Sequence, residues 1–450
     1  MKTPNIFYIH THDSGRFISP YGYAFPSPNI DDFSKGACLF RNCFCAAPTC
    51  SPSRAALLTG MAPHQNGMCG LAHRGWSLNS YSDHLVQILK GSGYETVLCG
   101  IQHEAPSDDM IGYDAIVGSR DYAMGKTEDS METFDYSNTQ SIVDYLESRK
   151  NDASPLFVSL GWYNTHREFP AVNPDISVDN IFVPAILPDT KEIREDMAGY
   201  ASSLMVVDRC FGQFIQSLKS LGLYDDSLII FTTDHGPAFP GMKGTLYDAG
   251  AGVFLIMKMP GQKKGMVLDQ MVSHYDVLPT ILDMLDIESK NSLIGKSMLN
   301  ILEGAPNELH DEIFIESSFH AAYEPKRAIR TKRWKYIIHF DPNDDPVLCN
   351  IDSSESKDFL LSNGLKEHPV DRVQLFDLYL DPTEKINLAG NTKYKEIEST
   401  LYDKLHSWME STDDPLLDGW EMPRPVGAII NKKTCISPRE KDYECVTFHR

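Results

Sequence analysis

The chain has 450 residues, of which 42% are hydrophobic and 23% are charged, and its formal net charge is −21 at pH 7. This length predicts one large domain together with a smaller one, and the composition is typical of a soluble globular protein. The acidic balance argues against nonspecific binding to nucleic acid or to an acidic membrane, so an anionic substrate would need a local basic pocket.

The first segment, MKTPNIFYIHTHDSG, does not resemble a signal peptide. Its short apolar run follows Pro4 and ends at His10, which is typical of a buried first strand. No apolar stretch reaches the roughly 18 residues that a membrane-spanning helix needs. We therefore expect a cytoplasmic protein without a membrane partner, unless processing has removed a leader.

Short apolar runs that are typical of buried parallel strands recur along the first two thirds of the chain. They are residues 5–10, 95–100, 156–162, 227–236 and 252–261. Helical patterns lie between or after them, at residues 81–93, 198–223 and 273–287. This alternation predicts an α/β fold in which helices sandwich a large, mostly parallel sheet.

The character of the sequence changes after about residue 322. Residues 327–340 alternate like strands of an antiparallel sheet, residues 373–389 have the pattern of a strand and a turn, and residues 391–410 that of a helix. We predict a large domain over residues 1–322 and a smaller C-terminal α+β domain with an antiparallel sheet over residues 323–450.

Polar side chains stand directly after several of the predicted strands. They are Asp13, His103, His166, Asp234 and His235. Because ligands of parallel α/β folds gather at the carboxyl ends of strands, this shared position predicts the functional site.

Most of the ten cysteines are predicted to be buried reduced thiols, although Cys435 and Cys445 could pair in an exported protein. Cys50 differs because it opens CSPSRAALLTG, residues 50–60, a helix start with Ser51 as the expected N-cap. A thiol at the positive end of a helix is a candidate nucleophile, but this pattern alone fits a structural thiol as well.

Residues 50–60 match every fixed position of the sulfatase signature Cys-x-Pro-Ser-Arg-x-x-x-Leu-x-Thr-Gly. FTTDHG, KGTLYDAG, SHYDVLPTILDML and LFDLYLDPTEKINLA also resemble sulfatase segments, so the resemblance spans nearly the whole chain. The sequence is identified as a member of the formylglycine-dependent sulfatases of the alkaline phosphatase superfamily, with residues 1–322 as the catalytic domain. SPSRAALLTGMAPHQNGM and THREF resemble the heparan N-sulfatase branch. That branch implies glycosaminoglycan degradation and a sulfated sugar such as N-sulfoglucosamine.

In that family the motif cysteine is oxidised to formylglycine (3-oxoalanine), which implies the same for Cys50 and a maturation enzyme as a partner. The chemistry gives a reason. A thiol that has accepted the sulfate group carries no second group that can release it. An aldehyde hydrate has two hydroxyls, one that attacks sulfur and one that expels sulfate.

The resemblance also implies a divalent metal. Asp13, Asp234 and His235 match the family's ligands, together with the converted Cys50. His12 stands where the family often has an aspartate, so it is either a further ligand or a neighbour of the ion. Calcium, which prefers oxygen ligands, is the expected ion, but two histidines would favour magnesium, manganese or another transition metal.

By the same resemblance, Arg54 holds the hydrated formylglycine and Lys243 binds the sulfate. His166 is the expected acid for the leaving group, and His103 the base for the second hydroxyl. Ile101 replaces the lysine that the family has two residues before that histidine. Weaker candidates for the substrate pocket are Arg167, His64, His73, His320 and Arg327.

Two other functions stay open at this point. A phosphodiester or phosphonate monoester hydrolase of the same superfamily would share the Asp-His metal pair. A catalytically inactive binding protein is suggested by Ile101 and His12. For the leading interpretation we expect a sulfated small molecule or oligosaccharide as substrate, with specificity in loops such as residues 104–140. A homo-oligomer is compatible with the sequence.

Overall fold

The computed structural model describes residues 3–120, 128–150, 152, 154–289, 292–419 and 421–444. Within them, nine strands form one sheet in the order β4-β3-β5-β1-β6-β8-β2-β7, with β9 paired to β2. The parallel run consists of β4 (Ala115–Val117), β3 (Glu95–Gly100), β5 (Leu156–Gly161), β1 (Ile6–Thr11) and β6 (Leu228–Thr233). The remaining strands are β2 (Cys38–Phe44), β7 (Gly252–Val253), β8 (Leu255–Lys258) and β9 (Met266–Ser273).

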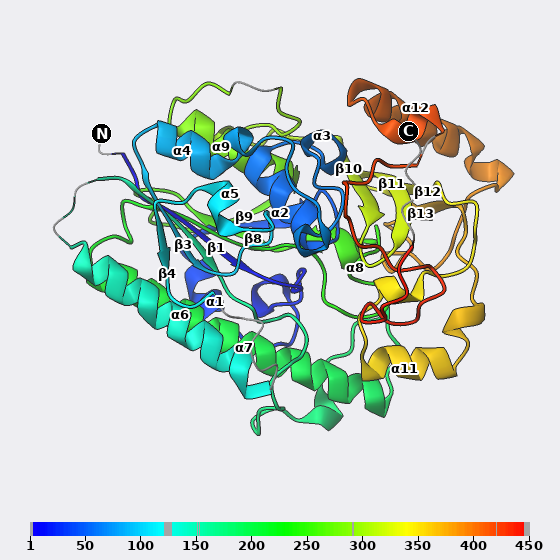
Figure 1. Cartoon of the computed structure of the whole chain (residues 1–450), viewed down its shortest axis with the longest axis horizontal. Coiled ribbons are helices and arrows are strands. Elements are labelled where there is room, and N and C mark those ends of the chain that lie inside the picture. The colour runs from blue at the N-terminus through cyan, green and yellow to red at the C-terminus, as the bar shows by residue number, and fades with distance from the viewer. Residues whose placement is uncertain are drawn as a thin grey trace.

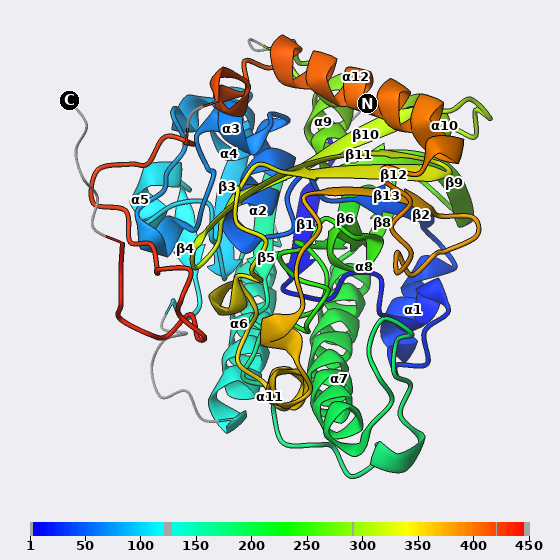
Figure 2. The same cartoon turned by 90° about the vertical axis from the view of Figure 1, so that its right-hand side faces the viewer.

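Helices cover both faces of this sheet (Figures 1 and 2). On one face lie α2 (Cys50–Thr59), α4 (Leu85–Gly91) and α9 (Val277–Met284), and on the other lie α6 (Glu128–Ser148) and α7 (Lys191–Ser220). The other helices are α1 (Pro28–Ser34), α3 (Pro63–Asn66), α5 (Asp108–Ile111), α8 (Asp248–Ala251), α10 (Leu299–Leu302), α11 (Glu355–Ser362) and α12 (Lys395–Ser411). The predicted α/β sandwich is confirmed.

Strand β1 shows why both faces need a helical layer. Its successive side chains point to opposite faces, so that Ile6 and Tyr8 join one hydrophobic cluster while Phe7 and Ile9 join the other. All four are buried. A strand that is apolar on both faces is stable only between two packed layers.

A second sheet is antiparallel, in the order β10 (Glu312–Phe319), β11 (Tyr323–Thr331), β12 (Trp334–His339) and β13 (Val373–Asp377). Helix α12 packs on it, and the Trp408 ring stacks on Phe314 with 4.8 Å between centroids. The predicted antiparallel sheet is confirmed. Its first strand lies before residue 323, while the domain boundary itself stays a prediction.

Two sequence expectations were wrong. Residues 252–261 form β7 and β8, which are antiparallel to their partners β2 and β6. The reason is that the chain returns from β6 without a covering crossover helix, and an apolar run does not encode strand direction.

Residues 104–140 are not all loop, since they include α5, β4 and the start of α6. In the described part of the chain, no helix is long and apolar enough to cross a membrane.

Helix α4 begins after the buried His84, whose Nδ1 accepts a hydrogen bond from the backbone N–H of Val86 at 3.2 Å. Burial lowers the pKa of His84 from 6.5 to about 3. The unfolded chain therefore takes up this proton first as the pH falls, and the free energy of unfolding should decline below pH 6.5. Between pH 6.5 and 3, the free energy of unfolding should therefore decline by on the order of 4 kcal/mol less in His84→Asn than in the wild type. Urea unfolding of both proteins across that range measures this, and equal declines would contradict it.

Candidate functional site

The carboxyl ends of β1, β3, β5 and β6 meet at one edge of the large sheet, and the polar residues that follow them converge there. His12 and Asp13 follow β1, and His103 follows β3. His166 follows β5, and Asp234 with His235 follows β6. Contacts among these side chains join all four strand ends.

Cys50 is the first residue of α2 and is only 4% exposed. The helix starts two residues earlier than expected, since Thr49 and not Ser51 is the N-cap. The Ser51 hydroxyl instead accepts a hydrogen bond from Ala72 N at 3.0 Å. The Cys50 Sγ lies 3.4 Å from His235 Nε2. Burial raises the pKa of the thiol, so the unmodified side chain is protonated at neutral pH.

The Asp234 carboxylate lies between several charged and titratable side chains of the site. One oxygen, Oδ2, lies 3.0 Å from Arg54 Nη2, 3.3 Å from His12 Nδ1 and 3.7 Å from His235 Nε2. The other, Oδ1, accepts a hydrogen bond from the backbone of Asp13 at 2.9 Å. Burial alone would raise the pKa of Asp234, but His235 and Arg54 hold that pKa well below its usual value.

Arg54 is buried, and its guanidinium points toward Asp234. Its Nη2 also donates to the carbonyl of Thr11 at 2.8 Å, and its Nη1 contacts His10 Nδ1. The guanidinium therefore fixes Asp234 against the end of β1, which is the geometry expected of a positioning cation.

Lys243 bridges two carboxylates. Its Nζ lies 2.8 Å from Asp13 Oδ2 and 3.1 Å from Asp352 Oδ2. Burial opposes the charged ammonium, but Asp13 and Asp352 overcome it and raise the pKa of Lys243 well above its usual value. Asp352 was not predicted from the sequence, because it lies in a loop more than a hundred residues after Lys243 and carries no periodic or motif signal.

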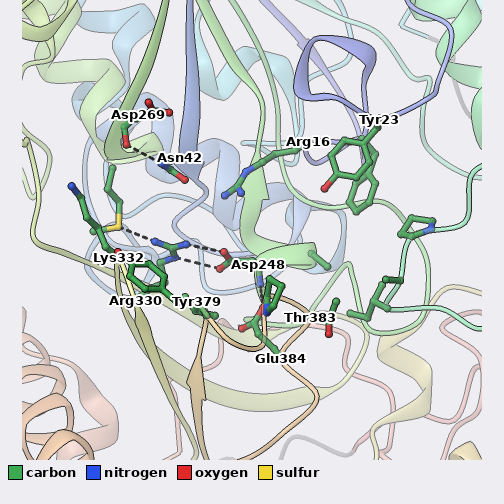
Figure 3. Close-up of a pocket in the computed structure, with 18 of the residues that line it drawn as sticks. Arg16, Tyr23, Asn42, Asp248, Asp269, Arg330, Lys332, Tyr379, Thr383 and Glu384 are labelled. Carbon is green, nitrogen blue, oxygen red and sulfur yellow. Dashed lines mark hydrogen bonds and ion pairs between the residues drawn. The ribbon is translucent and has the colours of Figure 1, made fainter.

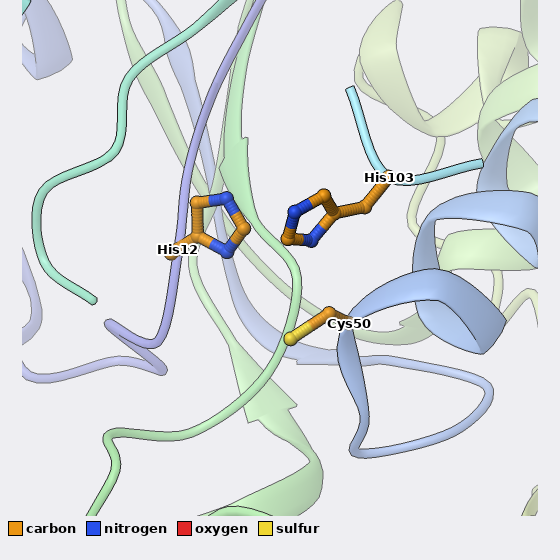
Figure 4. A group of neighbouring side chains, drawn as sticks. All are labelled: His12, Cys50 and His103. Atoms are coloured by element: carbon orange, nitrogen blue, oxygen red, sulfur yellow. The ribbon is translucent and has the colours of Figure 1, made fainter. Parts of the chain in front are cut away.

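Several imidazole rings gather beside Cys50. The His12 ring packs edge-on against His103, with 4.9 Å between centroids, and against His166, with 5.4 Å. His73 lies 6.2 Å from His103, again between centroids. Figure 4 shows His12, His103 and Cys50 turned toward one another. Ile101, which replaces the family lysine, is buried in an apolar cluster with Met131 and Tyr163.

Two other predicted substrate residues, Arg167 and His320, have different surroundings. Arg167 forms a two-pronged ion pair with Asp196, at 2.6 and 2.8 Å, and donates a third hydrogen bond to the carbonyl of Ala238. His320 is buried close to Lys243, and burial lowers its pKa to about 3. The geometry therefore makes Arg167 a structural support, whereas His320 stays beside the site.

His64 and Arg327 lie in a separate buried ion network. His64 Nδ1 is 2.5 Å from Glu316 Oε2, and Arg327 Nε is 2.5 Å from Asp414 Oδ2 and 3.3 Å from the same Glu316 oxygen. This network joins α3, β10 and β11 to the segment after α12. Both residues were predicted to line the substrate pocket, and that role stays a prediction. In the structure their side chains are engaged by ionic partners that the sequence does not reveal.

Replacing Arg327 with leucine should therefore destabilise the protein and leave catalysis by the folded fraction unchanged. The change leaves two buried carboxylates without their cation, which costs about 3–5 kcal/mol. Urea unfolding measures the loss, and KM of the folded enzyme is the control. An increase in KM with unchanged stability would return Arg327 to the substrate pocket.

A cavity of about 150 Å³ opens next to His166. Its lining residues are Met131, Tyr163, His166, Arg167, Glu168, Asp352, Ser353, Pro438 and Arg439. The C-terminal wall of this cavity was not predicted. A larger cavity of about 700 Å³ is lined by Arg16, Asp248, Arg330 and Glu384 among others (Figure 3). The described lining of that larger cavity includes none of the predicted site residues.

The donor set fits a divalent ion. One ligand atom from each of His12, Asp13, Cys50 and Asp234 lies within 4.8 Å of the others. Among the described residues, His12 Nε2 and Asp13 Oδ1 find no hydrogen-bond partner although both are buried. Buried polar atoms are costly unless something satisfies them, and a cation coordinated by these atoms would do so.

Comparison with known protein families gives two matches. The model named Sulfatase matches residues 4–287, and the model named N-sulphoglucosamine sulphohydrolase, C-terminal, matches residues 242–362. Human N-sulphoglucosamine sulphohydrolase is 28% identical over 448 residues, covering 87% of each chain. An ulvan-active sulfatase of Formosa agariphila is 29% identical and covers 87% of this chain and 76% of its own length.

Solved structures share the fold. A protein in complex with its substrate D-glucosamine-2-N,6-O-disulfate superposes with a TM-score of 0.72 at 18% identity, over 92% of this chain and 99% of the other. The phosphonate monoester hydrolase of Agrobacterium radiobacter gives a TM-score of 0.70 at 20% identity, over 91% and 96%.

Proposed function

Since this chain belongs to the sulfatase family and is a sulfuric ester hydrolase, we propose that it removes sulfate from an N-sulfated glucosamine. The match to the C-terminal region of N-sulphoglucosamine sulphohydrolase and the human relative of that name support this substrate. The observation that carries the chemistry is the placement of Cys50 Sγ among the Asp13 and Asp234 carboxylates at the start of α2.

The family implies a formylglycine at the motif cysteine. The raised pKa of the Cys50 thiol supports this, because an unconverted, protonated thiol is a poor nucleophile. When formed, the aldehyde hydrate supplies one hydroxyl that bonds to sulfur and a second whose deprotonation expels sulfate. Arg54 holds Asp234 in place, and Lys243 offsets the negative charge that develops on the sulfate oxygens.

Asp13, Asp234 and His235 would hold the divalent ion that the family implies, with His12 beside them. Such an ion withdraws charge from a sulfate oxygen. Calcium is the expected ion, and the two imidazoles favour manganese as the alternative. Elemental analysis of the purified enzyme distinguishes the two.

His166 is the proposed proton donor to the leaving group. Its Nδ1 lies 3.2 Å from the Tyr163 hydroxyl, and its ring lines the cavity of about 150 Å³. An amine or sugar hydroxyl is a poor leaving group, so His166→Gln should lower kcat on N-sulfoglucosamine about 10²–10⁴-fold. An aryl sulfate, which needs no acid, should lose much less. Comparing kcat on both substrates checks this, with His406→Gln on α12 as the control. Equal losses on both substrates would contradict the role.

Activity assays test the proposal as a whole. Enzyme co-produced with a maturation enzyme is assayed on N-sulfoglucosamine, glucosamine 6-sulfate and an aryl phosphonate monoester. We expect the N-sulfated sugar to be hydrolysed fastest. Fastest cleavage of the phosphonate would favour the second candidate, which the fold of the Agrobacterium hydrolase supports. No turnover and no bound metal would favour an inactive binding protein. A cytoplasmic location and a homo-oligomer stay predictions.

A further inference from the structure

The side chains of His12, Cys50 and His103 come from three separate segments and meet at the centre of the site (Figure 4). One ligand atom of each, two imidazole nitrogens and the Sγ, lies within 4.8 Å of the others. His12 and Cys50 are buried, and His103 is half-buried. His12 Nε2 makes no hydrogen bond to any residue that the structure describes.

From this geometry we propose that the folded chain with an unconverted Cys50 binds a zinc-class ion through His12, Cys50 and His103. One sulfur and two imidazole nitrogens are ligands that Zn²⁺ prefers, whereas calcium and magnesium prefer oxygen. This set differs from Asp13, Asp234 and His235, the ligands proposed for the mature enzyme, because it uses the thiol and His103.

The observed spacing allows such a site after small movements. Ligand atoms around a tetrahedral zinc lie about 3.5 Å apart. The three donor atoms lie at most 4.8 Å from one another, so side-chain shifts of about 1 Å bring them into contact with one ion. Asp13 and Asp234 form a second group with His12 and Cys50, which does not include His103. A carboxylate oxygen of either residue can take the fourth position.

Binding requires no oxidant. The S–H bond of Cys50 breaks, its proton goes to solvent, and the thiolate electron pair forms the bond to zinc. Charge also permits this. Asp13, Asp234 and Asp352 carry three negative charges against the two positive charges of Lys243 and Arg54. The single positive charge that zinc and the new thiolate add together offsets the remaining negative charge.

The consequence is a metal preference that depends on maturation. Conversion of Cys50 removes the sulfur, and the zinc-class site is lost with it. Zinc content would therefore report the unconverted fraction of a preparation. The test uses the unconverted chain and reads metal binding, so its failure is separate from a failure of the proposed sulfatase activity.

The experiment is a Co²⁺ titration of metal-free protein made in a host without a maturation enzyme, followed by displacement with Zn²⁺. We expect one equivalent of Co²⁺ and a thiolate-to-cobalt charge-transfer band. Cys50→Ser should abolish the band, and His103→Ala should weaken Zn²⁺ binding at least about 10-fold. The matched control is Cys38→Ser, a buried cysteine of β2 outside the cluster, which should keep both properties.

Three results would overturn the proposal. They are no Co²⁺ binding, an unchanged band in Cys50→Ser, and full Zn²⁺ affinity in His103→Ala. If a variant does not fold by circular dichroism, X-ray absorption of the zinc-loaded wild type replaces it. That measurement should give one sulfur at about 2.3 Å and at least two imidazole nitrogens. A shell of oxygen ligands without sulfur would contradict the site.

Discussion

Cys50→Ala is expected to lower kcat for sulfate release by at least about 10⁵-fold, because it removes the nucleophile on which every later step depends. The fold should tolerate the change, since the alanine keeps α2 intact and deletes only one sulfur atom in the site. Ion chromatography of sulfate released from N-sulfoglucosamine measures the effect.

The matched control for this change is Cys38→Ala, which removes another buried thiol but lies on β2 outside the site. It should retain kcat within a few-fold. If Cys50→Ala retained more than about a hundredth of the wild-type kcat, a different group would be the nucleophile.

Asp234→Asn is expected to remove the bound divalent ion and to lower kcat by at least about 10³-fold. The change also leaves the buried guanidinium of Arg54, 3.0 Å away, without its counter-charge. Loss of one partner of a buried ion pair costs about 3–5 kcal/mol, so the free energy of unfolding should fall as well. Elemental analysis, kinetics and urea unfolding measure the three effects.

Asp276→Asn separates stability from catalysis. Asp276 is fully buried, pairs with His310 at 2.9 Å and accepts a hydrogen bond from Ser273 N, but it is not part of the metal-ligand group. The free energy of unfolding of Asp276→Asn should fall by about as much as that of Asp234→Asn, while the variant keeps the bound ion and the wild-type kcat. An Asp234→Asn protein that still holds one equivalent of metal would show that the ion lies elsewhere.

The sequence was most informative where local pattern and topology act together. The spacing and the content of hydrophobic residues locate β1, β5 and β6. Because the carboxyl ends of parallel strands lie at one edge of the sheet, the residues that follow these strands converge there. This reasoning brings Asp13, His166 and Asp234 to one place before any coordinates are known. The helix start at residues 50–60 is encoded just as locally.

The contributions that were missed depend on long-range packing. Asp352 reaches the site from the connection between β12 and β13, and Pro438 and Arg439 reach it from the segment after α12; no local pattern specifies either approach. The direction of β8 is likewise set by the path of the chain after β6. Arg327 shows the same limit, because a lone arginine in a sequence does not show that Asp414 and Glu316 lie against its guanidinium.

The most direct test of the central claim is the mass of the peptide that contains Cys50, taken from protein purified from its native host and shown to release sulfate. Conversion of the thiol to an aldehyde lowers the residue mass by about 18 Da relative to cysteine, and we expect that mass in the active fraction. An unmodified cysteine in fully active enzyme would contradict the formylglycine mechanism and require a different nucleophile.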